Sequence, residues 1–284
     1  LDAIVEDQKG GTPFATKNIL MVSHFLASSV PMTLAMKKLG ARFENTIMVG
    51  TPYGSNPTAV ENVRGMGFDL RVPPLDEAAY KAAVEKALDE MVAKHRKNGE
   101  TIVVLDDGGL VADILHRNME KYADVIGAFK LVEQTTGGLL LAEKHDLQVP
   151  IIKAAKARAK IREGELIGRA VATKVRQGLE RLSKSLDGQS AIVTGFGTIG
   201  QATAKELRAA NVDVLIVEPN DTKRRLAKSL GFRVAAAPPL EALRKTDLFI
   251  GTTGERTLTL EQMRELKSGV IVASASSKQA EFAM

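Results

Sequence analysis

The chain has 284 residues, of which 44% are hydrophobic and 26% charged, a size and composition typical of two α/β domains. It contains no Cys and no Trp and only 4% aromatic residues, which excludes disulfides, thiolate metal sites and a cysteine nucleophile and argues against stacking platforms for single-stranded nucleic acid. No apolar run approaches the length of a transmembrane helix, and the first residues lack a basic-then-apolar pattern, so we expect no signal segment. We therefore expect a soluble cytoplasmic protein that does not bind a membrane.

The net charge of +5 is concentrated in one segment. Residues 153–185 carry ten Lys or Arg against three Glu, a local charge of +7 that leaves −2 for the remainder. The basic residues are Lys153, Lys156, Arg158, Lys160, Arg162, Arg169, Lys174, Arg176, Arg181 and Lys184. Two interpretations stay open: an anion-binding site, or a solvated helix face whose Lys and Arg stems cover apolar neighbours.

Apolar runs typical of buried strands alternate with helical stretches in the first half of the chain. Strands are expected at 18–22, 43–49, 101–105, 125–131 and 149–152, and helices at 30–39, 58–64, 75–95 and 138–145. Gly40 is a helix stop, and Thr58 is a plausible N-cap. The cluster Gly50 to Pro57 and the run Asp106-Asp107-Gly108-Gly109 are expected to be loops.

The same alternation continues in the second half. A long helix is expected at 165–185, followed by strands at 190–194, 212–217, 232–235, 248–251 and 270–273 and helices at 200–209, 222–230 and 240–245. The pattern predicts an α/β fold with two doubly wound, mostly parallel sheets and right-handed crossovers. Placing the boundary at the turn Asp187-Gly188 gives a substrate-binding, catalytic-type domain over 1–187 and a Rossmann dinucleotide-binding domain over 188–284.

The glycine pattern Gly195-Phe196-Gly197-Thr198-Ile199-Gly200 lies between a predicted strand and a predicted helix, which is the context that a dinucleotide fingerprint requires. Its glycines allow a tight turn, close approach of a pyrophosphate, and close packing of helix on strand. Glu218, at the end of the next strand, can accept hydrogen bonds from ribose hydroxyls, which favours NAD. Arg224 and Arg225 follow it and leave NADP open, and a purely structural glycine turn is the alternative.

Further motifs accompany the fingerprint in a fixed order. Residues 105–109 read LDDGG, residues 133–138 read EQTTGG, Val149-Pro150 is followed by Lys160, and Thr252-Thr253-Gly254 follows the strand 248–251. Together they resemble the motifs of the S-adenosyl-L-homocysteine hydrolase (adenosylhomocysteinase) family, whose second motif reads EETTTG. The resemblance runs from residue 18 to the end, and the sequence is identified as a divergent, C-terminally shortened member.

This resemblance implies a two-domain, homo-oligomeric enzyme with tightly bound NAD. The family oxidises a ribose 3′-hydroxyl, eliminates homocysteine, adds water and reduces the ketone again. By the same resemblance, His24 is the acid/base histidine, Asp107 contacts substrate, and Lys160 works on the 3′-hydroxyl. Thr135 and Thr136 contact NAD, as do the residues of the fingerprint and of Thr252-Thr253-Gly254.

Departures from the family pattern bear on this assignment. Gln134 replaces a glutamate, Gly164 and Glu165 replace an aspartate and an asparagine, and Ser274 and Ser277 replace an asparagine and a histidine. His24 is also compatible with a strand cap, Asp107 with an Asx-turn and Lys160 with a solvated lysine. No His or carboxylate spacing is typical of a metal site, so no catalytic metal is expected.

The sequence therefore favours an adenosylhomocysteinase-like NAD enzyme acting on a nucleoside or nucleotide, with an altered substrate. The alternative is a catalytically degenerate NAD-binding regulatory or interaction protein. RNA binding through residues 153–185 is a third hypothesis, and we do not expect a nucleic-acid partner.

Overall fold

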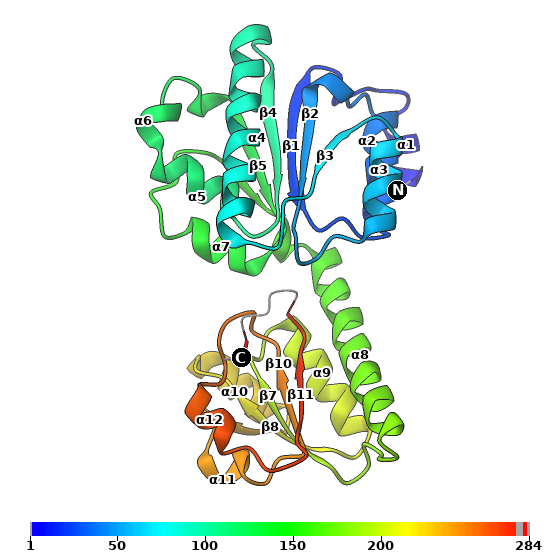
Figure 1. Ribbon diagram of the computed structural model, residues 1–284, viewed down its shortest axis with the longest axis vertical. Coiled ribbons are helices and arrows are strands. Elements are labelled where there is room, and N and C mark those ends of the chain that lie inside the picture. The colour runs from blue at the N-terminus through cyan, green and yellow to red at the C-terminus, as the bar shows by residue number, and fades with distance from the viewer. Residues whose placement is uncertain (1, 277–280, 283–284) are drawn as a thin grey trace. The chain divides into compact units, whose positions relative to one another are not determined.

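The computed structural model describes residues 2–276, 281 and 282. The chain divides into two compact units, Leu1–Ala157 and Arg158–Met284, and each consists of a parallel sheet covered by helices (Figure 1). The division precedes helix α8 (Arg158–Arg181), whereas the expected boundary lay at Asp187-Gly188. The difference arises because α8 packs along α9 (Thr198–Ala209) and so forms part of the second unit.

The first unit contains a six-stranded sheet in the order β3-β2-β1-β4-β5-β6, and its described strand pairs are all parallel. The strands are β1 (Lys17–Ser23), β2 (Thr46–Gly50), β3 (Asp69–Arg71), β4 (Thr101–Asp106), β5 (Phe129–Glu133) and β6 (Ile151–Lys153). The direction of winding reverses between β1 and β4, which pair from Lys17–Thr101 to Met21–Leu105. This is the doubly wound order of dinucleotide-binding folds.

Helices cover both faces of the first sheet. They are α1 (Asp2–Asp7), α2 (Ser29–Lys38), α3 (Pro57–Gly65), α4 (Glu77–Asn98), α5 (Leu110–Arg117), α6 (Met119–Tyr122) and α7 (Thr136–Ala142). Residues of α2 and α3 pack with one apolar cluster, and residues of α4, α5 and α7 with the other, so that the two groups lie on opposite sides of the sheet (Figure 1). Fully buried side chains such as Leu20 and Met21 alternate between the two clusters, because successive strand residues face opposite sides.

Local sequence signals begin and end these helices. The side chain of Asn56 accepts a hydrogen bond from the N–H of Ala59 ahead of α3, and Asp76 does the same for Ala79 in α4. Helix α4 ends at Gly99, which adopts a left-handed conformation with φ of 69°. Each side chain satisfies a backbone donor that a helix end leaves unpaired, so the capping residues determine where the helices start.

The second unit contains a five-stranded sheet in the order β11-β10-β7-β8-β9, again with parallel pairs throughout the described strands. The strands are β7 (Ser190–Thr194), β8 (Asp213–Val217), β9 (Arg233–Ala235), β10 (Leu248–Gly251) and β11 (Ile271–Ser274). The order reverses between β7 and β10, which places the cofactor fingerprint at the reversal point.

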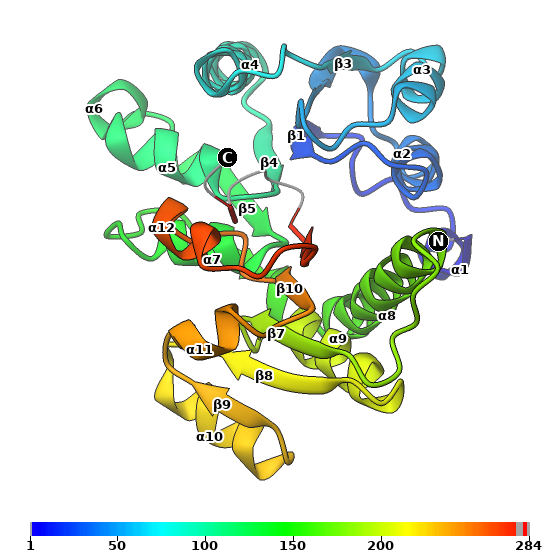
Figure 2. The ribbon, with the colours of Figure 1, turned by 60° about the horizontal axis from the view of Figure 1, so that its bottom comes forward.

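Helices α8, α9 and α10 (Asp221–Ser229) contribute to the core on one face of this sheet, and α11 (Leu240–Leu243) and α12 (Leu260–Arg264) to the other (Figure 2). Two glycines set the approach of α8 to α9. A Cβ at Gly164 would lie 2.7 Å from Cγ2 of Thr198, and one at Gly168 would lie 2.4 Å from Cβ of Ala202. Only glycine permits this close helix contact, so Gly164 has a structural reason for departing from the family aspartate.

The expected α/β fold with two doubly wound parallel sheets is confirmed, and the differences concern short elements. The strand expected at 43–49 begins with a 3₁₀ turn at Phe43–Asn45, and the strand expected at 125–131 is shifted to β5. Five α-helices or strands were missed: α1, β3, α5, α6 and α12. Among the described residues, the helices lack the length or the apolar character that crossing a bilayer requires.

Candidate functional site

In each unit, the turns that follow the two strands at the reversal point of the sheet carry groups that can bind a ligand or react with it. Open α/β sheets bind ligands beyond the carboxyl ends of their strands at such points. In the first unit, His24 follows β1 and Asp107 follows β4; in the second, Gly195 follows β7 and Thr252 follows β10. The two turns differ in composition and are described separately.

The glycine turn of the second unit is shaped by close backbone contacts. Gly195 has φ of +90°, which side-chain-bearing residues rarely adopt. A Cβ at Gly200 would lie 2.2 Å from the carbonyl oxygen of Gly195 and 2.7 Å from Oγ1 of Thr252. These two glycines therefore let α9 begin directly against the end of β7, as the sequence pattern predicts.

The middle glycine provides space for a ligand. Gly197 is the N-cap residue of α9 and has no side chain to cover the first N–H groups of the helix, in the turn that contains Thr198 and Ile199. Within the described part of the chain, a Cβ built on Gly197 would meet no atom within 4 Å. Exposed helix N–H donors, the positive end of the helix dipole and free space beside the backbone fit the pyrophosphate of a dinucleotide.

Glu218 is fixed against the same turn. Its side chain is 5% exposed, its Oε2 accepts a hydrogen bond of 2.8 Å from the N–H of Phe196, and its Oε1 accepts one of 2.9 Å from Asn220. Each carboxylate oxygen can accept further hydrogen bonds, so the pair of ribose hydroxyls expected there has acceptors. The carboxylate would repel a 2′-phosphate.

Arg224, one of the two arginines that could bind the 2′-phosphate of NADP, forms hydrogen bonds within its own turn. The guanidinium of Arg224 donates to the carbonyl oxygens of Glu218 and Pro219 and to the carboxylate of Asp221. Arg225 is paired with the same aspartate. The local hydrogen bonds of these arginines agree with NAD as the cofactor.

The loop after β10 completes this edge of the second sheet. The N–H and the hydroxyl of Thr252 both donate to the carbonyl oxygen of Thr194, at 3.0 and 2.7 Å. The next two residues, Thr253 and Gly254, donate their N–H groups to the buried carboxylate of Glu281. Sequence reasoning missed Glu281, because nothing in the local sequence indicates that the chain returns to this edge.

His24 and Asp107 meet at the reversal point of the first sheet. Nδ1 of His24 lies 2.9 Å from Oδ2 of Asp107, and both side chains are partly buried. An ionised carboxylate only accepts hydrogen bonds, so with Asp107 ionised the imidazole donates through Nδ1. This contact fixes the orientation of the imidazole relative to Asp107.

Gln134 joins this pair from the end of β5. Its Nε2 donates to Oδ2 of Asp107 at 3.2 Å and to Oγ of Ser23 at 3.1 Å, and Ser23 in turn donates to the same carboxylate oxygen at 3.4 Å. An amide here supports the negative charge of Asp107, whereas the glutamate of the family would add a second negative charge. The departure at residue 134 therefore changes the electrostatics of the turn.

The loop Gly50 to Pro57 packs against the imidazole. A Cβ at Gly54 would lie 2.0 Å from Cδ2 of His24, so only glycine allows this approach. The ring of Tyr53 meets the His24 ring edge-on, with centroids 5.5 Å apart. Burial and the nearby charge of Asp107 raise the pKa of Tyr53, which keeps its hydroxyl protonated.

Two further carboxyls are buried beneath Asp107. Asp106 is 1% exposed and accepts N–H groups from Val111 and Ala112 at the start of α5, and Glu133 is 2% exposed and accepts the N–H of Gly108. Burial, reinforced by the charge of Glu133, raises the pKa of Asp106 to about 8, and burial also raises the pKa of Glu133. These acids therefore hold the backbone of the turn that carries Asp107.

The structure places the remaining candidate residues as follows. The Thr135 hydroxyl caps α7 by accepting the N–H of Gly138 at 3.0 Å and donates to Glu133 at 2.6 Å, while Thr136 is exposed. Lys160 belongs to the second unit and forms an ion pair of 2.7 Å with Glu163 on α8. Ser277 lies outside the described residues. Among the described residues, no three His, Asp or Glu side chains are grouped to hold a metal ion.

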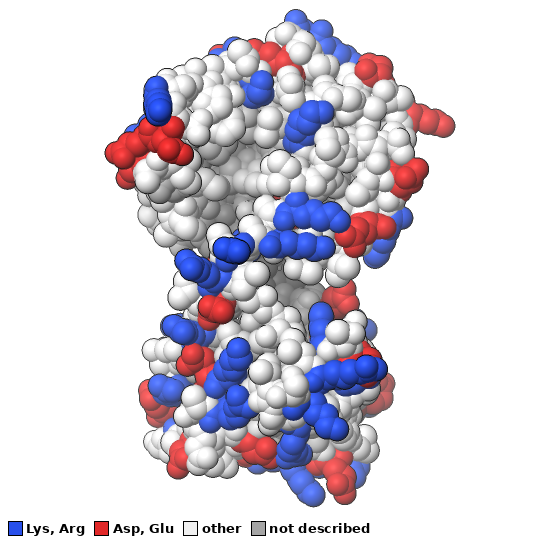
Figure 3. Space-filling model, turned by 180° about the vertical axis from the view of Figure 1, so that it is seen from behind, with Lys and Arg blue, Asp and Glu red and all other residues white. Residues whose placement is uncertain are grey.

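The basic segment 153–185 is divided between the two units. Lys153 and Lys156 lie in the first unit, and the other members lie in the second. Lys153, Lys160 and Arg169 are paired with glutamates. The face seen from behind shows Lys and Arg interspersed with Asp and Glu (Figure 3). This mixture favours a solvated helix over a polyanion-binding surface.

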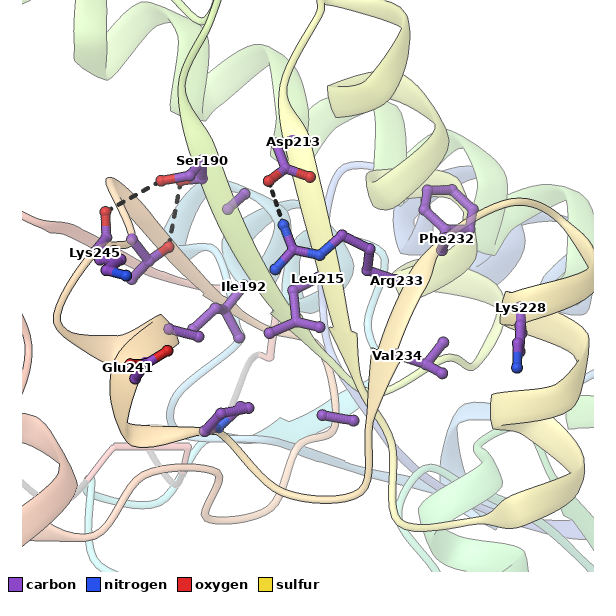
Figure 4. A pocket seen from close by; sticks show the side chains of 15 residues that line it. Ser190, Ile192, Asp213, Leu215, Lys228, Phe232, Arg233, Val234, Glu241 and Lys245 are labelled. Atoms are coloured by element: carbon purple, nitrogen blue, oxygen red, sulfur yellow. Dashed lines mark hydrogen bonds and ion pairs between the residues drawn. The ribbon is translucent and has the colours of Figure 1, made fainter.

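A pocket of about 760 Å³ opens elsewhere on the second unit (Figure 4). It is lined at its polar side by Ser190, Asp213 and Arg233, which begin β7, β8 and β9, and Arg233 pairs with Asp213. These are the amino ends of the strands, opposite to the edge that carries the glycine turn. We assign it no ligand, because parallel sheets of this kind bind at the other edge.

Fold and site together define an α/β chain whose second unit is a Rossmann dinucleotide-binding domain. Residues 170–284 match the model of the S-adenosyl-L-homocysteine hydrolase NAD binding domain. The resemblance drawn from the motifs is thereby confirmed: the chain is a divergent relative of the S-adenosyl-L-homocysteine hydrolase family, and its cofactor is NAD.

Relatives match over most of this chain. The adenosylhomocysteinase of Nostoc sp. is 27% identical over 277 residues, covering 93% of this chain and 60% of that protein. That of Saccharolobus solfataricus is 26% identical, covering 94% and 62%, and an uncharacterized protein of Mycobacterium tuberculosis is 27% identical, covering 93% and 51%. The chain thus spans between half and two thirds of the length of these relatives. Among solved structures, a dipicolinate synthase of Bacillus halodurans superposes with a TM-score of 0.47 at 12% identity, covering 95% of this chain and 90% of that one.

Proposed function

We propose that the protein is an adenosylhomocysteinase-like NAD-dependent enzyme that acts on a nucleoside-type substrate by transient oxidation of a ribose 3′-hydroxyl. The observation that carries this proposal is the His24–Asp107 pair, which joins a histidine to a carboxylate at 2.9 Å on a chain that also matches an NAD-binding domain. In this proposal, the first unit supplies His24 and Asp107, and the second unit holds the cofactor and supplies Lys160.

The chemistry divides among the residues of the chain. NAD, when bound, supplies a hydride acceptor and later returns the hydride. Lys160 takes the proton of the 3′-hydroxyl as the carbon-bound hydrogen leaves as hydride, which gives a 3′-ketone. The ketone makes the 4′-proton acidic, and Nε2 of His24, oriented by Asp107, removes that proton while the 5′ substituent departs. Addition of water and reduction of the ketone reverse these proton transfers.

The departures at the site support a substrate other than S-adenosylhomocysteine. Gln134 replaces a carboxylate, so the turn at Asp107 carries one negative charge fewer than in the family. The family asparagine position holds Ser274, whose hydroxyl donates to Glu281. A less negative turn is more compatible with an anionic substrate, such as a nucleotide phosphate, than the family turn is.

The test uses the full chain with NAD and a panel of ribonucleosides and ribonucleotides. We expect the absorbance of reduced nicotinamide to appear with at least one of them. Replacing His24→Gln or Asp107→Asn should lower the rate of a full turnover by about 10²- to 10⁴-fold, the usual contribution of a general acid–base group. Release of the 5′ substituent at the wild-type rate in both variants would contradict the assigned roles.

His95→Gln is the matched control. Its imidazole is bonded through Nδ1 to the carbonyl oxygen of Glu100 at 2.9 Å, ahead of β4 and so at the opposite edge of the same sheet. Its loss should leave the rate within about twofold, as expected of a substitution outside the reacting groups. No reduction with any member of the panel, together with NAD binding that Lys160→Ala does not alter, would instead indicate the degenerate NAD-binding protein.

A further inference from the structure

Glu281 lies at the carboxyl edge of the second sheet. Its carbonyl oxygen accepts hydrogen bonds from the N–H of Thr257 at 2.8 Å and from the hydroxyl of the same residue at 3.1 Å. Phe282 forms a parallel bridge with Leu258, and its ring packs edge-on against Phe249, with centroids 6.1 Å apart. The backbone of Glu281 is therefore anchored, and its side chain is held at the end of β10.

The carboxylate of Glu281 binds the backbone of the loop after β10. Oε1 accepts the N–H of Thr253 at 2.6 Å and that of Gly254 at 3.0 Å, and Oε2 accepts the hydroxyl of Ser274. Glu281 is 1% exposed, so these hydrogen bonds take the place of solvation. Hydrogen bonds to an ionised acceptor are about twice as strong as neutral ones.

Two glycines are matched to this carboxylate. Gly251 ends β10, and a Cβ there would lie 2.6 Å from Oε2 of Glu281, so the carboxylate fits only against glycine. Gly254 has φ of +73°, a conformation that directs successive N–H groups toward one anion and that other residues adopt at a cost. The loop is thus shaped around the carboxylate.

The loop lies over a defined half of the sheet. Strand β10 pairs with β7 on the side away from β8, whereas Glu218 ends β8 and marks the adenosine half. In doubly wound folds, the two halves of a dinucleotide bind on the two sides of the reversal point. The loop at Thr252 to Gly254 therefore corresponds to the nicotinamide half, and its contact with Gly195 ties it to the fingerprint: a Cβ at Gly195 would lie 2.9 Å from Cγ2 of Thr253.

We propose that Glu281 is a positioning residue for the nicotinamide half of NAD. Its carboxylate fixes the conformation of Thr253-Gly254, and through that loop it determines the affinity for the part of the dinucleotide beyond the pyrophosphate. The role rests on the NAD-binding assignment of this unit. It acts through the loop and requires no contact of Glu281 with the cofactor.

If Glu281 has this role, its loss should affect the binding of NAD and of ADP differently, although both ligands contain the adenosine half. ADP contains the adenosine and the pyrophosphate, which contact Glu218 and the fingerprint, but lacks the nicotinamide riboside. Loss of the carboxylate in Glu281→Ala should leave the N–H groups of Thr253 and Gly254 and the hydroxyl of Ser274 without their acceptor, so the loop loses its fixed conformation. Affinity for NAD should then fall while affinity for ADP stays unchanged.

Calorimetric titration of the full chain with NAD and with ADP tests this. For Glu281→Ala we expect the NAD dissociation constant to rise about tenfold or more, in line with the loss of charge-assisted hydrogen bonds, and that of ADP to change by less than about twofold. Glu281→Gln keeps a carbonyl oxygen for the two N–H groups and should recover most of the NAD affinity. Glu255→Gln, which changes an exposed carboxylate of the same loop, should match the wild type for both ligands.

The outcomes distinguish the proposals. Equal losses for NAD and ADP in both Glu281 variants would show that Glu281 merely supports the whole domain, and unchanged NAD affinity in Glu281→Ala would show that it positions nothing; either result overturns the role. Failure of the wild-type chain to bind NAD at all would overturn the proposed enzyme itself, before any variant is compared.

Discussion

At the reversal point of the first sheet, the chain leaves β1 through Ser23-His24 and meets Asp107 after β4; at that of the second, it leaves β7 through Gly195-Phe196-Gly197. Both sheets wind in the same order outward from these points. The first turn presents side chains that donate and accept hydrogen bonds, whereas the second lacks side chains at its glycines and presents backbone N–H groups. The strand order therefore creates the position of a site, and the residue types of the turn decide its chemistry.

The difference also appears in how the turns are stabilised. In the first unit, the buried carboxyls of Asp106 and Glu133 hold the backbone under Asp107. In the second, contacts at Gly195 and Gly200 are so close that side chains would not fit there, and Glu281 holds the neighbouring loop. The turn that we propose for proton transfer thus has buried acids beneath it, and the turn that we propose for the pyrophosphate has glycines.

The largest expected effect comes from filling the glycine turn. Gly200→Val introduces a Cβ 2.2 Å from the carbonyl oxygen of Gly195, so we expect the second unit to lose about 1–3 kcal/mol or more and NAD binding to disappear. Hydrogen exchange of peptides from β7 and β8, together with NAD titration, measures both effects.

Gly197→Ala is its counterpart in the same turn. Its φ of −74° suits alanine, and a Cβ there points into open space within the described part of the chain. We expect unchanged hydrogen exchange but weaker NAD binding, because the methyl group would occupy the space assigned to the pyrophosphate. Equal NAD affinity in Gly197→Ala and the wild type would contradict the placement of the pyrophosphate.

The next effect concerns the pH dependence of the first unit. Because the pKa of Asp106 rises to about 8 on folding from an ordinary value near 3.8, the folded unit holds a proton that the unfolded chain releases. Its stabilising contribution is complete below pH 3.8 and is lost as pH rises through about 8. We expect the unfolding free energy of the wild type to fall across this window and that of Asp106→Asn, which resembles the protonated form, to fall less.

Tyrosine fluorescence reports this unfolding selectively. The chain has three Tyr and no Trp, and Tyr53, Tyr80 and Tyr122 all lie in the first unit. Denaturant titrations at several pH values therefore follow the first unit alone. The pKa of Glu133 is also raised, so this residue makes the unfolding free energy fall with pH in the same direction. Some pH dependence should therefore persist in Asp106→Asn. Identical slopes in both proteins would refute the protonated state of Asp106.

The parts of this site that follow from sequence are those with local steric or topological causes. The glycine fingerprint can be predicted because the need for its glycines arises within one strand-turn-helix unit. The meeting of His24 and Asp107 at 2.9 Å follows the rule that adjacent parallel strands end at one edge. Short elements such as α5 were missed because its apolar residues directly follow the Asp-Gly turn, where a loop was expected.

Other features depend on tertiary contacts that no local pattern encodes. Gly54 against the His24 ring and Glu281 under the loop after β10 each join segments far apart in sequence. Gly164 was interpreted as the loss of a family aspartate, but it also allows α8 to approach α9, and the same packing moves the unit division ahead of α8. A helix belongs to the unit against which it packs, and sequence alone does not identify that partner.

The smallest expected effect tests the difference in charge between the turn at Asp107 and the corresponding turn of the family. Gln134→Glu places a carboxylate where Nε2 now lies 3.2 Å from Oδ2 of Asp107. The added negative charge should disfavour an anionic substrate more than a neutral one, by about 1 kcal/mol or roughly fivefold at the effective dielectric of a partly buried site. The measurement is the ratio of the KM values for a ribonucleotide and its ribonucleoside in NAD reduction, which should rise in the variant.

Gln148→Glu makes the same chemical change at an exposed position, where the amide likewise donates to an aspartate, Asp146, at 3.1 Å. Solvent screens that charge, so the KM ratio should stay at the wild-type value. A ratio that falls in Gln134→Glu would mean that the substrate phosphate does not approach Asp107, and the preference for an anionic substrate would have to arise from other cations. A ratio that rises equally in both variants would assign the effect to the net charge of the protein. A local contact with the substrate should instead raise the ratio only in Gln134→Glu.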